Sequence, residues 1–232
     1  MSLFTRWFGA SVELPHALAS RLQAWERLGQ ESERVPLDKA SFVVVDVETS
    51  GLDPRKDRLL AIGACELQEG RLLAGKGFER IVFQEETSEK ENILIHGIAP
   101  GEQATGLPPE QALLDFLDYA GKRILVAYHA MFDRTVIDRT MREVLGTRLP
   151  NHWLDLAELA PALYPEARLP HASLDEWLYR FDIQVRERHR AIDDVLATGE
   201  LMLVLLSRAR ERGLQTVSQL LATAESQHHA ML

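Results

Sequence analysis

The sequence predicts an α/β protein in which helices cover a central mixed sheet. Three observations support this fold class. Residues 42–45 form a continuous apolar run, mostly β-branched, which is typical of a strand buried on both faces. Two more strand-forming stretches follow, and short apolar runs then alternate with helical periodicity. Strands followed by alternating strands and helices indicate a mixed sheet flanked by helices.

The first 38 residues are expected to form a helical extension that packs on the core or on a partner. The apolar positions that recur at helical spacing over residues 15–30 are Leu18, Leu22, Trp25 and Leu28. A polar run and Pro36 then end this pattern. The pattern alone favours the simpler alternative, a helix that only stabilises the core.

Two strand candidates follow the first buried strand, at residues 59–67 and 71–83. Only the short turn Glu69-Gly70 lies between them, so they predict an antiparallel hairpin. Pro108-Pro109 then opens a helix that Gly121 ends.

The remaining elements alternate between strand and helix. A short buried strand is expected at residues 124–127, and a helix from residue 133 to 145. Ser173 and Glu176 have the spacing of a capping box, so a helix is expected to begin at Leu174. A long last helix is expected over residues 191–210.

Composition excludes several classes of protein. The chain has 232 residues, 46% of them hydrophobic, and a formal net charge of −9. Its single cysteine, Cys65, excludes a disulfide scaffold or a zinc–thiolate cluster. We find no signal peptide and no run of eighteen apolar residues, so we expect a cytoplasmic protein without a membrane partner. The acidic balance disfavours a broad duplex-binding surface, unless cations lie between the carboxylates and the phosphates.

Two acidic residues follow the first buried strand directly. Asp46 and Glu48 are two residues apart, so they project to one face while Val45 and Val47 point to the other. Neighbouring carboxylates repel unless one is protonated or cations neutralise them. Divalent cations such as Mg²⁺ prefer oxygen ligands of this kind. An Asp-x-Glu motif alone is also found at solvated strand ends.

Further titratable residues occur where later helices begin. Asp133 is expected near a helix N-terminus at the carboxyl edge of the sheet, where α/β proteins bind ligands, although it could equally cap that helix. His189 and Asp194 would point about 140° apart on one helix. We therefore place His189 in the preceding loop, where its near-neutral pKa suits a general base, and Asp194 in the first turn.

These motifs, in this order, resemble those of the DEDDh 3′–5′ exonucleases, the DnaQ-like superfamily that includes the proofreading epsilon subunit of bacterial DNA polymerase III. The resemblance covers about residues 40 to 208 and rests on three motifs: Asp46-x-Glu48, Asp133, and His189-x-Ala191-x-x-Asp194. His96-Gly97-Ile98 matches a further segment common in the family, and Leu154-Asp155-Leu156 lies where members often have a strand that ends in Asp.

The resemblance implies a ribonuclease H-like fold with a five-stranded mixed sheet, in an exonuclease domain at residues 39–210 followed by a helical tail at 211–232. It also implies two divalent ions, Mg²⁺ or Mn²⁺, which activate water and stabilise the leaving oxygen. The implied ligands are Asp46, Glu48, Asp133 and Asp194, with His189 as the general base. The product would be a nucleoside 5′-monophosphate from the 3′ end of single-stranded nucleic acid, with DNA favoured. The implied substrate contacts are Thr49, Gly51, Leu52, His96, Ile98, His129 and Phe132.

One motif departs from the family pattern. Tyr128-His129 stands where members usually have His-Asn, which removes an amide expected near the substrate. Three alternatives therefore stay open: an oligoribonuclease-like enzyme, an RNA-trimming exonuclease, and a catalytically weak binding module or polymerase accessory subunit. Gln219-Leu220-Leu221 faintly resembles a clamp-binding peptide, so a DNA polymerase or clamp is a candidate partner. The sequence leaves the oligomeric state open.

Overall fold

The computed structural model describes residues 12–86, 93, 97–185 and 190–231. Within these residues, six strands form one sheet in the order β3-β2-β1-β5-β6, and β4 also pairs with β2. The strands are β1 (Ser41–Thr49), β2 (Leu59–Gln68), β3 (Arg71–Leu72), β4 (Phe78–Ile81), β5 (Ile124–Ala127) and β6 (Trp153–Asp155). Strand β1 is antiparallel to β2 and parallel to β5, and β5 is parallel to β6. The predicted mixed sheet is confirmed.

The predicted hairpin forms, but its second arm is not one strand. Residues 71–83 divide into β3 and β4, with the 3₁₀ turn η1 (Ala74–Lys76) between them. Gly75 and Gly77 lie in this interval, and glycine weakens a strand because it has no side chain to pack. The described sheet therefore has six strands, where the resemblance to the exonuclease family implied five.

The described helices are α1 (His16–Glu26), α3 (Pro100–Ala104), α4 (Pro109–Ala120), α5 (Ala130–Val144), α6 (Leu156–Leu163), α7 (Leu174–Arg180), α8 (Ala191–Glu211) and α9 (Val217–Met231), with a 3₁₀ turn η2 (Pro165–Ala167). The predicted helices are present, α5 begins three residues before its predicted start, and α3 and α6 were not predicted. The capping box of α7 forms as predicted, and α1 ends earlier than expected, at Glu26. Among the residues that the structure describes, no helix combines the length and the apolar character that crossing a membrane requires.

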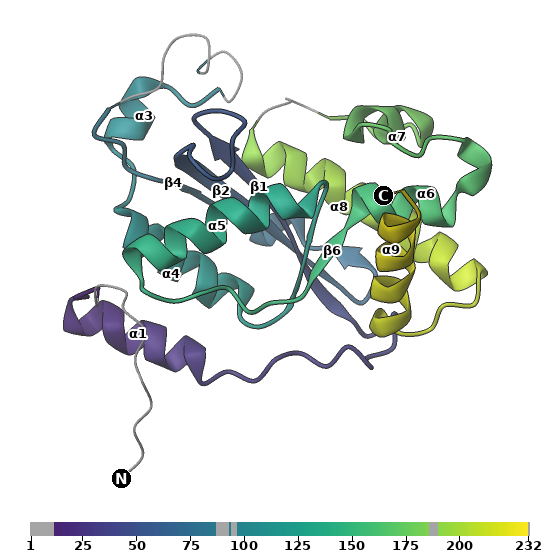
Figure 1. Ribbon diagram of the computed structural model, residues 1–232, viewed down its shortest axis with the longest axis horizontal. Helices are drawn as coiled ribbons and strands as arrows, with labels where there is room; N and C mark the ends of the chain where they lie inside the picture. Colours follow the sequence, from purple (N-terminus) through teal and green to yellow (C-terminus); the bar gives the residue numbers. More distant parts are fainter. Residues whose placement is uncertain (1–11, 87–92, 94–96, 186–189, 232) are drawn as a thin grey trace.

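The sheet separates two hydrophobic clusters. One lies under α1, α4 and α5 and contains Val43, Val45 and Val47 of β1. The other lies under α6, α7, α8 and α9 and contains Val44 (Figure 1). The alternation predicted for β1 is thus confirmed, and Asp46 and Glu48 lie on the same face of the strand as Val44, toward α8.

The last helix belongs to the second cluster. Helix α9 packs on α6, and its Val217 and Leu220 are fully buried. Gln219 accepts hydrogen bonds from the backbone N–H groups of Gln215 and Thr216 at 2.7 and 3.1 Å, which caps the helix. The segment that resembles a clamp-binding peptide is therefore folded and largely buried, and the motif gives no support for a clamp as partner.

Candidate active site

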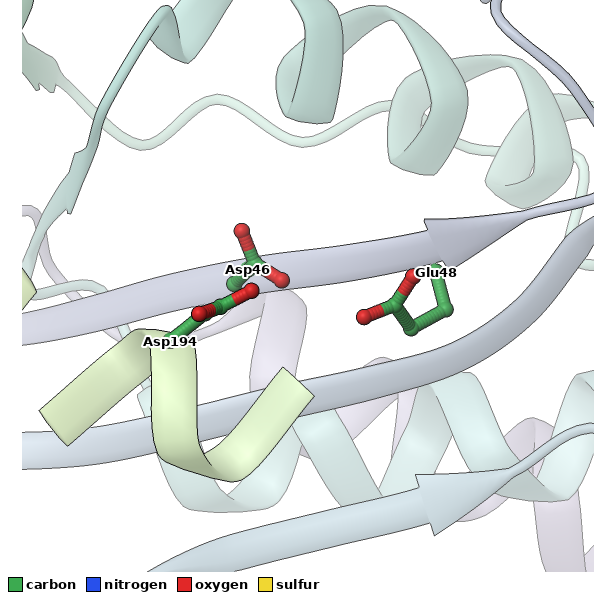
Figure 2. A group of neighbouring side chains, drawn as sticks. All are labelled: Asp46, Glu48 and Asp194. Carbon is green, nitrogen blue, oxygen red and sulfur yellow. The ribbon is translucent and has the colours of Figure 1, made fainter. Parts of the chain in front are cut away.

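Three carboxylates meet at the carboxyl end of β1. Asp46 and Glu48 project from β1 toward the first turn of α8, which carries Asp194 (Figure 2). One ligand oxygen from each residue lies within 4.8 Å of the others. We call these three residues the acidic trio. Oxygen ligands on opposite sides of Mg²⁺ are about 4 Å apart, so a small inward movement would let the trio bind a divalent cation.

The start of α8 reaches the trio because a glycine lets it approach the sheet. Gly63 of β2 pairs with Asp46 across the sheet. A Cβ atom at Gly63 would lie 2.6 Å from the backbone carbonyl carbon of Ala191, closer than real Cβ contacts. The first residue of α8 therefore rests directly on β2, which places Asp194 of the same first turn beside β1. A carboxylate in the first turn of a helix is also favoured by the helix dipole.

Asp133 reaches β1 from the opposite face of the sheet. It lies in the first turn of α5, is 4% exposed, and accepts a hydrogen bond from the backbone N–H of Val47 at 3.1 Å. Burial raises the pKa of Asp133, although the N–H donors of the backbone favour its charged form. Val47 stands between Asp46 and Glu48, so Asp133 touches the strand between the two acids. It is not a member of the trio itself.

A left-handed turn precedes α5 and depends on Asp155. His129 has a φ of 61°, and its N–H donates to Asp155 Oδ1 at 2.9 Å. The same oxygen accepts from the N–H of Ala157 at 2.9 Å, so Asp155 also caps α6. Burial raises the pKa of Asp155. This carboxylate thus joins the ends of β5 and β6 at the sheet edge that carries the site.

Tyr128, where the family pattern usually has His, has a structural contact in this chain. Its hydroxyl donates to the carbonyl oxygen of Ala172, just before α7. Burial raises the pKa of Tyr128, so the hydroxyl keeps its proton at physiological pH. The residue attaches the loop before α7 to the end of β5.

The turn after β1 carries three of the predicted substrate contacts. The hydroxyl of Thr49 donates to the carbonyl oxygen of Gly51 at 2.6 Å. The backbone of Gly51 packs against the Asp57 carboxylate, which accepts from the N–H of Asp53 at 2.7 Å. Leu52 is 90% exposed at the tip of this turn. The turn is thus rigid and presents one apolar side chain to solvent.

The other predicted contacts fall in two places. Ile98 packs on Leu60 and lines a small hollow with Glu48. His129 and Phe132 line a separate pocket of about 450 Å³ between α5, β6, α6 and α9. His96 and His189 lie outside the described residues.

Three features of the site were not found from the sequence. These features are the hydrogen bonds of Asp155, the close approach of α8 to Gly63, and the ion pair between Arg190 and Glu79. The sequence did contain a signal for Gly63, because an isolated glycine inside a strand indicates close approach of another backbone.

Comparison with known proteins agrees with this geometry. A family model described as an exonuclease, that of RNase T, matches residues 43–202. The chain belongs to the RNase T exonuclease family. It is 33% identical over 189 residues to a DNA polymerase III subunit epsilon-like protein of Rhodobacter capsulatus, a match that covers 80% of this chain and 26% of that protein. It is 32% identical over 187 residues to the PolC-type DNA polymerase III of Halalkalibacterium halodurans, covering 80% of this chain and 13% of that one.

Solved exonuclease structures share the fold. Exonuclease I of E. coli in complex with a dA16 oligonucleotide has a TM-score of 0.64 at 21% identity, over 75% of this chain and 42% of that one. Exonuclease X in complex with 5′ overhanging duplex DNA has a TM-score of 0.61 at 21% identity, over 79% of this chain and 99% of that one. The predicted ribonuclease H-like fold is confirmed, and the family makes the chain a nuclease.

Proposed function

We propose that this exonuclease domain removes nucleoside 5′-monophosphates from the 3′ end of single-stranded DNA and requires divalent cations, Mg²⁺ or Mn²⁺. The observation that carries the proposal is the acidic trio, in which three carboxylates lie within 4.8 Å of one another in a chain of an exonuclease family. Carboxylate oxygens are the ligands that these hard cations prefer. When bound, two such cations lower the pKa of the attacking water and stabilise the leaving oxygen.

Residues of this chain would bind the cations, accept the proton of the attacking water and hold the substrate. Asp46, Glu48 and Asp194 would hold the cations together with Asp133, whose carboxylate has a second oxygen besides the one bonded to Val47. His189 would accept the proton of the attacking water, consistent with its place immediately before Arg190 and α8. Thr49, Gly51, Leu52, His96 and Ile98 would hold the terminal nucleotide, and His129 and Phe132 would contact the strand beyond it.

A polymerase subunit is the second candidate, because the curated relatives above are named as DNA polymerase III proteins. The chain spans 26% of one and 13% of the other, so it matches one part of much longer proteins. In this role the same site would remove nucleotides from the end of a growing strand. Co-elution of the chain with a polymerase would support this role.

Digestion of end-labelled oligonucleotides tests the main proposal. A 3′ label should appear in a mononucleotide at the first time point, while a 5′ label should appear in a ladder of shortening products. Single-stranded DNA, RNA of the same sequence and paired ends are compared with Mg²⁺ and with Mn²⁺. Faster digestion of RNA would favour the RNA-trimming alternative. The Asp46→Ala variant should abolish cleavage and keep its fold, and equal cleavage by this variant would contradict the proposal.

The general base is tested separately. The His189→Ala variant should lose about a hundred- to ten-thousandfold in kcat, because no group then accepts the proton of the water. It should still bind Mn²⁺, which calorimetry measures directly. Full activity in this variant would show that another group is the base.

A further inference from the structure

We propose that Glu79 is a positioning residue for this active site. Through its ion pair with Arg190, Glu79 fixes the start of α8, and thereby the place of Asp194. The inference rests on the proposed exonuclease function, since it assigns a role to residues around the same site.

The pairing of three strands places Glu79 in line with the acidic trio. Asp46 of β1 lies opposite Gly63 of β2, and Gly63 lies opposite Glu79 of β4. Residues directly opposite in neighbouring strands lie on one face of the sheet. Asp46, Gly63 and Glu79 therefore form one row, and the missing side chain in the middle of this row is where Ala191 rests.

Helix α8 touches this row on both sides of its first turn. A Cβ atom at Gly77 would come within 3.0 Å of Ile192 Cδ1, so the chain just before β4 also contacts the start of α8. On the side toward β1, the next residues bring Asp194 to Asp46. On the side toward β4, Arg190 Nη2 lies 3.8 Å from Glu79 Oε2.

The N-cap side chain does not fix the start of α8. Arg190 occupies the N-cap position and makes no side-chain cap hydrogen bond. Polar N-cap residues normally satisfy the first N–H groups and fix the entry of the chain. In α8 the contact with Gly63 sets the depth of the helix start, and the pair of Arg190 with Glu79 limits its sideways movement along the sheet.

The same pair also borders the metal-binding carboxylates. Glu79 and Arg190 line the small hollow that contains Glu48 and Ile98. Both members of the pair are partly exposed, with side-chain exposures of 46% for Arg190 and 31% for Glu79, so the pair contributes little to the stability of the fold. A small loss of position at α8 should nevertheless change catalysis, because the ligands and the base must be aligned.

A double-mutant cycle on the full chain tests the proposal. The variants Glu79→Gln and Arg190→Gln each remove one charge and keep a polar side chain. We expect each to lower kcat about tenfold, with KM and the melting temperature unchanged. The double variant should lose the same tenfold, because the second change removes a contact that is already broken. Glu211→Gln is the matched control, since it breaks the Arg208–Glu211 pair at the other end of α8 and should leave kcat unchanged.

Calorimetric binding of Mn²⁺ gives a readout that needs no activity. Both single variants should bind Mn²⁺ about tenfold more weakly, because Asp194 is less well placed. If the wild-type chain released no nucleotides but these affinities still fell together, the positioning role would stand and the proposed reaction would fail. If the wild type is active, two results would overturn the positioning role. One is a loss of kcat in the double variant equal to the product of the two single losses, and the other is a change in KM alone in Arg190→Gln. Either result would make Arg190 a direct substrate contact.

Discussion

Two groups of carboxylates at one edge of the sheet are stabilised in different ways. The acidic trio brings three side chains within 4.8 Å of one another, so each ionised group raises the cost of ionising the others. Asp133 and Asp155 are instead held individually, by backbone N–H groups of Val47, His129 and Ala157. Their main electrostatic cost is burial, which raises the pKa of both.

The two groups of carboxylates therefore differ in how they depend on a bound cation. Positive charge relieves repulsion between neighbouring carboxylates, so a divalent cation bound by the trio would stabilise these residues. The backbone donors of Asp133 and Asp155 are present whether or not a cation is bound. They join α5 to β1 and the end of β5 to β6.

The largest effect is expected at the trio. Asp194→Asn should lower kcat by about a thousandfold, since a cation ligand contributes several kcal/mol to the transition state. Asp193→Asn is the matched control, because the neighbouring residue is not in the trio. Mn²⁺ should raise the melting temperature of the control and of the wild type but not that of Asp194→Asn. Equal losses in both variants would show that helix distortion, and not ligand loss, is the cause.

A smaller effect is expected where α8 rests on the sheet. Gly63→Ala places a methyl group 2.6 Å from the backbone of Ala191, so the start of α8 must move away from β1. We expect kcat to fall about a hundredfold through misplaced ligands, and stability to fall by about 1–3 kcal/mol from overpacking. Gly75→Ala is the control, since nothing lies within 4 Å of a Cβ atom there. Normal kcat in Gly63→Ala, measured on 3′-labelled DNA, would show that the trio tolerates a moved helix.

Local patterns in the sequence predicted much of the fold and the face on which Asp46 and Glu48 lie. The apolar run before Asp46 identified a buried strand, and strand periodicity placed both acids toward one side. Pro108-Pro109, Gly121 and the Ser173 capping box marked helix boundaries that the structure confirms. These features depend on residues close together in the chain, which is why a single sequence is enough to find them.

Features that depend on distant segments were not predicted. The role of Gly63 becomes clear only when α8, far along the chain, is seen to rest on it. The contact of Asp155 with the turn at His129 requires the pairing of β5 with β6. One local feature was also missed: residues 71–83 divide into two strands, although both halves have strand-forming residues and Gly75 and Gly77 lie between them.

The smallest effect is expected on stability at Asp155. Its folded-state pKa is raised by burial, so the folded state keeps the proton to higher pH than the unfolded state, where the pKa is about 3.9. The free energy of unfolding should therefore fall by up to about 1.4 kcal/mol per pH unit above pH 4, until the pH passes the folded-state pKa.

Asp155→Asn keeps an oxygen acceptor for the N–H groups of His129 and Ala157 and has no proton to lose. Its unfolding free energy should match that of the wild type at pH 4 and exceed it at pH 7, as measured by urea denaturation with a chelator present. Asp155→Ala removes the acceptor and should be about 1–3 kcal/mol less stable than the wild type at pH 4, with a smaller difference at pH 7, where ionisation of Asp155 destabilises the wild type. If Asp155→Asn were instead less stable than the wild type at pH 7, the charge of Asp155 would be contributing to the fold, and the distinction between the two groups of carboxylates would not hold at this residue.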